Sequence, residues 1–93
     1  MDNSALQHQD LKAFAHSENT LEILIEDNIC LDKASLMILG ENRNLLKMIT
    51  EFDHRLEVEI YTGNPMFIEL NTINGRAVTY VKGSGSNFYK NNN

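Results

Sequence analysis

The sequence has few of the features that mark secreted or membrane-bound proteins. A single cysteine, Cys30, excludes an internal disulfide and is typical of a reducing compartment. No apolar run approaches the roughly 18 residues that a membrane-spanning helix needs, and no basic segment followed by an apolar one stands at the N-terminus. With 42% hydrophobic and 23% charged residues, the composition is that of a globular protein. The sequence therefore predicts a soluble, cytoplasmic protein without membrane contact.

Basic residues are also scarce, and the formal net charge is −5. Residues 1–32 hold seven of the 13 acidic residues and only one base, Lys12. Nucleic-acid binding needs a basic surface that releases counterions, so this balance argues against it. The acidic N-terminal third favours a basic protein partner, whose capture it would accelerate. The alternative is that these acids serve only solubility.

Motifs of catalysis and cofactor binding are missing. The glycines at 83–86 lack the lysine and the following helix of a phosphate loop. His8 and His16 lie eight residues apart, more than two turns on the expected helix, so they cannot share one metal ion. His54 stands between an acid and a base, but catalysis would need a partner group in a pocket, and its role stays open. The sequence predicts no enzyme, catalytic residue, cofactor or metal.

Three alternating segments near the C-terminus, at about 55–82, predict an antiparallel meander. They are Arg55–Thr62, Met66–Ile73 and Arg76–Lys82. Asn74-Gly75 between two of them favours a two-residue hairpin turn, because both central positions of that turn need positive φ. Pro65 excludes a three-residue loop in the first hairpin, since proline cannot adopt positive φ, and favours a five-residue loop or a bulge.

The hairpin turn sets the register of this predicted sheet. Pairing Ile73 with Arg76 places Leu70 opposite Thr79 and Ile68 opposite Val81. The first hairpin then places Ile60 opposite Ile68. On the other face, the expected pairs are Glu69 with Tyr80, Phe67 with Lys82 and Glu59 with Glu69.

The rest of the chain completes a predicted α+β fold. Leu45, Met48, Ile49 and Phe52 follow helical spacing, so a helix is expected at about 43–52, packed on the sheet. A capping box at Ser4 predicts an N-terminal helix at about 5–16. One or two further strands are expected from residues 20–39, at about 21–26 and 35–39, although residues 35–39 also suit a helix.

Residues 1–83 are expected to form one small α+β domain, and residues 84–93 a flexible tail rich in Gly, Ser and Asn. Phe88 and Tyr89 are the exception, because two adjacent aromatics rarely serve a solvated tail. Whether they fold back onto the domain stays open.

One face of the predicted meander is the candidate binding site. Aromatic residues flanked by charges resemble the centre and rim of a protein interface, and two facing glutamates are easier to retain beside a basic partner. The leading hypothesis is an acidic protein-binding module that regulates or inhibits a partner. The alternatives are a homodimeric assembly protein that uses the same face and, less favoured, a small ligand-binding protein or enzyme. The candidate residues are Glu57, Glu59, Tyr61, Phe67, Glu69, Val78 and Tyr80.

Overall fold

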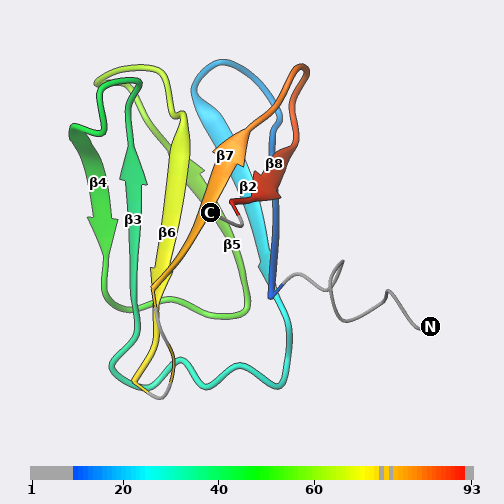
Figure 1. Cartoon of the computed structure of the whole chain (residues 1–93), viewed down its shortest axis with the longest axis vertical. Helices are drawn as coiled ribbons and strands as arrows, with labels where there is room; N and C mark the ends of the chain where they lie inside the picture. The colour runs from blue at the N-terminus through cyan, green and yellow to red at the C-terminus, as the bar shows by residue number, and fades with distance from the viewer. Residues whose placement is uncertain (1–9, 74, 76, 92–93) are drawn as a thin grey trace.

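The computed structural model describes residues 10–73, 75 and 77–91, and this part of the chain is all-β (Figure 1). The described residues contain no helix, so the predicted α+β class is wrong. Eight strands follow one another along the chain: β1 (Leu11–Ala15), β2 (Thr20–Ile25), β3 (Ser35–Leu39), β4 (Leu45–Ile49), β5 (Arg55–Glu59), β6 (Phe67–Asn71), β7 (Val78–Lys82) and β8 (Phe88–Lys90).

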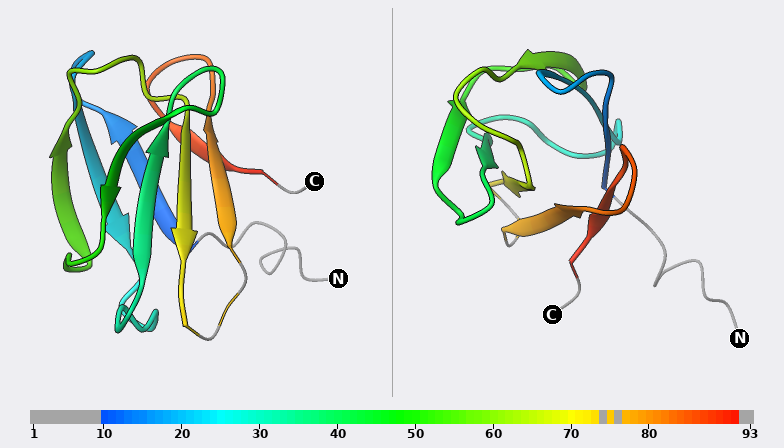
Figure 2. Two further views of the ribbon diagram at one scale, coloured as in Figure 1. Left: turned by 90° about the vertical axis from the view of Figure 1, so that its left-hand side faces the viewer. Right: turned by 90° about the horizontal axis from the view of Figure 1, so that it is seen from above.

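The strands form two antiparallel sheets around one interior (Figure 2). The three-stranded sheet has the order β1-β2-β5, and the five-stranded sheet has the order β4-β3-β6-β7-β8. β1 and β8 join the sheets on one side through a bridge between Phe14 and Asn87 and a 2.9 Å bond from the Ala15 N–H to the Ser86 carbonyl. The molecule is therefore a barrel with one open side.

The open side is a seam between β4 and β5. Lys47 Nζ donates to the Glu59 carbonyl oxygen at 3.3 Å, and Thr62 Oγ1 donates to the Leu46 carbonyl oxygen at 3.5 Å. The side chains of Lys47 and Thr62 thus bond across the seam, where β4 and β5 are not paired as strands in the described part of the chain. A groove of about 410 Å³ runs along this seam and includes Ile49, Phe52 and Leu56 in its lining.

Alternation along the strands fills the interior with apolar side chains. β2 alternates buried Leu21, Ile23 and Ile25 with partly exposed residues, as expected for a strand with one face on a core. Burying one large aliphatic side chain contributes about 1.5–3 kcal/mol. The buried hydrophobic residues are Leu11, Ala13, Leu21, Ile23, Ile25, Ala34, Leu36, Ile38, Leu39, Val58, Ile60, Ile68, Leu70, Tyr80 and Phe88.

Both predicted helices are wrong where the structure describes them. Residues 45–49 of the expected 43–52 helix form the edge strand β4, and a register shift between Ile38 and Leu39 leaves Leu46 as an extra residue. Such a bulge breaks the two-residue period, which explains why the apolar spacing resembled a helix. Residues 11–15 of the expected 5–16 helix form β1, and residues 5–9 lie outside the described residues.

The predicted meander is only partly correct. Its three segments are strands, but β5 pairs with β2 in the other sheet and not with β6. The β6–β7 register also differs by one residue from the prediction, since Phe67 faces Val81 and Ile68 faces Tyr80. A one-residue shift exchanges the two faces of a strand, so Tyr80 enters the core. The expected pair of Ile73 with Arg76 lies outside the described residues.

Two other segments settle alternatives that the sequence left open. The strand at 35–39 is confirmed as β3, and the one at 21–26 corresponds to β2, which begins one residue earlier. Within the expected tail, Phe88–Lys90 forms β8 and pairs with β7. Phe88 is 3% exposed, so it folds back into the core.

Candidate interaction surface

An apolar row crosses the outer side of the five-stranded sheet. The register places Leu45, Leu39, Phe67, Val81 and Tyr89 directly opposite one another on five neighbouring strands. Their chain neighbours Ile38, Ile68, Tyr80 and Phe88 are buried, so alternation directs the row away from the interior. These five residues are called the outer row below.

Exposure increases toward both ends of the outer row. Leu39 is buried, Phe67 and Val81 are partly exposed, and Leu45 and Tyr89 are 55% and 48% exposed. Gly83 makes room for the Tyr89 ring, because a Cβ at this glycine would lie 2.6 Å from a ring carbon.

The next positions on the same face add Met37 and Met48, and Met48 is 53% exposed. Methionine adapts to varied partner shapes.

Arg43 covers part of the outer row. Its guanidinium carbon lies 4.2 Å from the centre of the Phe67 ring, a cation–π contact worth about 0.5–1 kcal/mol at an exposed site. The loop holds Arg43 at φ 62° through a 2.9 Å bond from its N–H to the Gly40 carbonyl. A non-glycine residue at positive φ is uncommon and stores strain of the kind found at ligand clamps.

The outer face of the three-stranded sheet is different, because most of its side chains are charged, with three glutamates beside Lys12 and Arg55. Glu22 lies opposite both Phe14 and Glu57, and Glu59 lies opposite Thr20. Glu22 Oε1 is 2.6 Å from His16 Nε2.

The residues predicted to form the binding site do not come together. Tyr80 is fully buried, and Val78 lies on the same inner side of β7. Tyr61, at 71% exposed, follows β5, which carries Glu57 and Glu59 on the three-stranded sheet. Only Phe67 and Glu69 lie on the outer face of the five-stranded sheet.

Sequence reasoning missed the other members of the outer row: Leu39, Leu45, Val81 and Tyr89. The alternation of residues 78–82 could have revealed Val81. Shifting the predicted β6–β7 register by one residue places Val81, instead of Tyr80, on the face that carries Phe67. No comparable sequence signal pointed to Leu45, which lay in the predicted helix.

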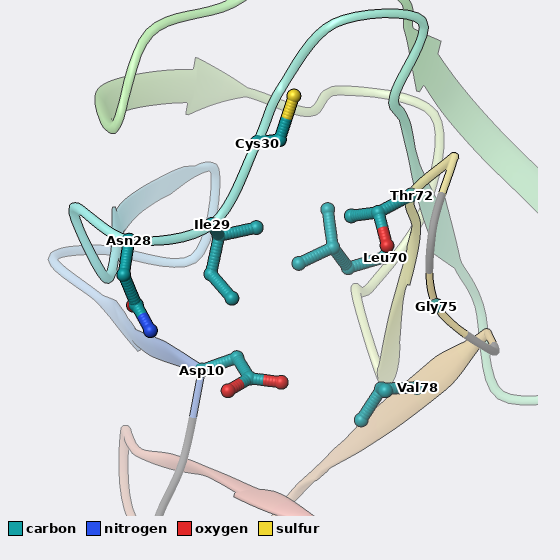
Figure 3. A pocket seen from close by; sticks show the side chains of 8 residues that line it. All are labelled: Asp10, Asn28, Ile29, Cys30, Leu70, Thr72, Gly75 and Val78. Carbon is teal, nitrogen blue, oxygen red and sulfur yellow. The ribbon is translucent and has the colours of Figure 1, made fainter.

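A cavity of about 390 Å³ opens at the end of the barrel that carries the β2–β3 loop and the β6–β7 turn (Figure 3). Its lining includes Asp10, Ile29, Leu70, Thr72 and Val78. The Asp10 carboxylate and the side chains of Ile29 and Leu70 point toward a common centre, whereas the Cys30 sulfur points away from it. A second cavity, of about 520 Å³, lies among the loops that include Glu18, Asn44 and Asn64.

The Tyr80 hydroxyl is buried and has no hydrogen-bond partner among the described residues. Burial raises the pKa of Tyr80 to about 12, and the nearby Asp10 carboxylate adds to this rise. The backbone N–H groups of Asp10 and Leu11 partly oppose it.

His54 has a structural contact. Its Nε2 lies 2.9 Å from the Ile29 carbonyl oxygen, and the Ile25 N–H donates to the His54 carbonyl at 2.7 Å. The ring thus ties the β2–β3 loop to the segment before β5. Within the described part of the chain, no three His, Cys, Asp or Glu side chains gather closely enough to hold a metal ion.

Comparisons with protein-family models, curated proteins and solved structures found no match. In the residues that the structure describes, there is no helix of the length and apolar character needed to cross a membrane.

Proposed function

We propose that this protein is a small binding module that docks a partner protein on the outer row and thereby regulates or inhibits it. The observation that carries this proposal is the continuity of the row across five strands, with large apolar side chains exposed at both ends. Apolar residues that are exposed at the margins of a sheet face and bordered by polar groups are also found at protein interaction sites.

The size of this surface favours a separate partner over an obligate dimer. Five strands spaced by about 4.8 Å give a row about 19 Å long. The methionines widen the apolar strip to roughly 10 Å on β3 and β4, whereas β6 and β7 carry Glu69 and Thr79 at the matching positions. Its area is on the order of 200 Å², against roughly 800 Å² per partner in a standard interface. The row therefore suits the apolar centre of an interface whose rim is polar.

The negative net charge of the protein favours a basic partner. The net charge of −5 attracts basic proteins at a distance, and this attraction increases association rates. The free thiol of Cys30 is exposed, which favours a reducing compartment such as the cytoplasm.

A homodimer through β4 is the second candidate. β4 is an edge strand of its sheet, and its exposed Leu45 and Met48 favour pairing with another copy. Lys47 on the same edge and the bulge at Leu46 oppose such pairing, because natural sheets use both to protect their edges.

Leu45→Glu and Tyr89→Glu test both candidates, because each residue is exposed at one end of the outer row. Ile73→Glu is the matched control, since Ile73 is 53% exposed and lies outside the row. We expect monomeric wild-type protein in light scattering. In quantitative capture with this protein as bait, we expect a basic protein to bind the wild type. Its binding should decrease at least tenfold with Leu45→Glu or Tyr89→Glu and should stay unchanged with Ile73→Glu. Added salt should weaken the binding to the wild type.

Equal capture by all four proteins would contradict docking on the outer row. A wild-type dimer that Leu45→Glu converts to a folded monomer, while Tyr89→Glu leaves it intact, would establish the β4 homodimer instead.

A further inference from the structure

We propose that the open-end cavity binds a small apolar molecule that carries a protonated amine. This site is separate from the outer row and goes beyond protein docking. It opens between the β2–β3 loop and the β6–β7 turn (Figure 3), whereas the outer row lies on the outside of the five-stranded sheet.

The cavity has the makeup of a ligand site. Ile29, Leu70 and Val78 give it apolar walls, and two polar side chains, Asp10 and Thr72, also line it. Small-molecule sites are concave and mostly apolar, have few polar groups, and occur in the mouths of β-barrels. At about 390 Å³, the cavity lies within the usual range of roughly 300–1,000 Å³.

Tyr80 is fully buried and lies two residues along β7 from Val78, which lines the cavity. It is the next inward-facing residue of β7 after Val78, and its hydroxyl lies close enough to the Asp10 carboxylate to sense its charge. The hydroxyl is fully buried and has no hydrogen-bond partner among the described residues. The Asp10 carboxylate therefore acts on a group inside the barrel as well as on the cavity.

Charge decides the class of ligand. The Asp10 carboxylate points into the cavity, and no basic side chain is among the described residues that line it. A carboxylate repels fatty acids and phosphates and attracts an ammonium group. It can accept several hydrogen bonds, so a bond within the protein leaves capacity for a ligand.

The volume sets the size of the ligand. A cavity of about 150 Å³ holds benzene, so about 390 Å³ open on one side suits roughly nine to fifteen non-hydrogen atoms. 2-Phenylethylamine fits this range, and 2-phenylethanol and 3-phenylpropanoate are its neutral and anionic counterparts.

Titration of the ¹⁵N-labelled full chain with these three compounds, followed by NMR, tests the proposal. We expect the amine to shift the backbone signals of Ile29, Leu70 and Val78 with a Kd at least about tenfold lower than that of the alcohol. We expect no shift from the anion. Asp10→Asn should reduce the affinity for the amine to that of the alcohol, and Asp27→Asn, in the same loop region but outside the lining, should leave it unchanged.

Val78→Phe provides a second variant, because a larger side chain fills the cavity from β7. The amine and the alcohol should then both lose binding while the NMR spectrum stays that of a folded protein. Equal binding of amine and alcohol to the wild type, or no binding of either, would overturn the proposal. Shifts confined to the outer row would overturn it as well.

Discussion

The outer faces of the two sheets differ in the side chains that they present to solvent, although their inner faces are equally apolar. The three-stranded sheet presents Glu22, Glu57 and Glu59, and two of these face each other. The five-stranded sheet presents the outer row, with Leu45 and Tyr89 exposed. The shared core explains the inner faces, but folding alone requires neither a pair of facing glutamates nor a line of exposed apolar residues. This difference is the basis of the proposal that a partner docks on the outer row and not on the charged face.

The largest expected effect tests whether the inner faces are equivalent. Ile23→Ala on the three-stranded sheet and Ile68→Ala on the five-stranded sheet each remove a fully buried side chain. Each variant should lose about 2–5 kcal/mol of unfolding free energy, since both leave a cavity in the same core. Denaturant unfolding measures both losses. A large loss from one and almost none from the other would show that the sheets do not share one cooperative core.

The next effect concerns Tyr80, which links the five-stranded sheet to the start of β1. Its pKa in the folded protein is raised to about 12 from 10, so the unfolded chain loses the phenolic proton first as pH rises. The stabilisation is fully present below pH 10 and is lost between about pH 10 and 12, by up to about 3 kcal/mol.

Unfolding curves of the wild type and Tyr80→Phe at pH 8 and pH 11 isolate this effect. Tyr80→Phe should resist the alkaline loss and should cost little at pH 8, since it removes a buried hydroxyl without a hydrogen-bond partner in the described part. Identical alkaline losses in both proteins would contradict the assignment to Tyr80.

The smallest expected effect lies on the charged face. Glu57→Gln removes one of two facing carboxylates and should stabilise the protein by about 0.2–1 kcal/mol, less at high salt. Glu59→Gln is the matched control, because its neighbour across the sheet is the uncharged Thr20. Thermal unfolding at low salt compares them, and a gain of equal size from both variants would mean that net charge matters and the facing pair does not.

Alternation predicted strands well where one face is buried and the other is not. The segments of β5, β6 and β7 were identified for this reason, whereas β3 was expected from a short apolar run that also suits a helix. The method was wrong for β4, where exposed Leu45 and Met48 and the bulge at Leu46 imitate a helical stripe. Hydrophobic spacing alone does not distinguish an apolar edge strand from an amphipathic helix.

The candidate site depended on register and pairing, which are harder to predict than strands. One residue of shift at the β6–β7 turn moved Tyr80 into the core and brought Val81 beside Phe67. The partner of β5 could not be inferred from nearby residues, because β2 lies more than thirty positions earlier in the chain. Long-range pairing follows from the closure of the barrel and not from local turn residues.

The pairing of β2 with β5 also has a consequence for how the protein folds during synthesis. After residues 11–25 leave the ribosome, both edges of the β1–β2 hairpin are unpaired. The β2 edge stays unpaired until residue 59 emerges, and the β1 edge until Asn87 emerges. The five-stranded sheet in turn requires β6 to join β3 across the intervening β4 and β5. Contacts this distant in sequence slow folding, so we expect millisecond-to-second refolding. In that interval, the edges of this hairpin rather than the finished surface are the parts of the chain most open to aggregation or to a chaperone.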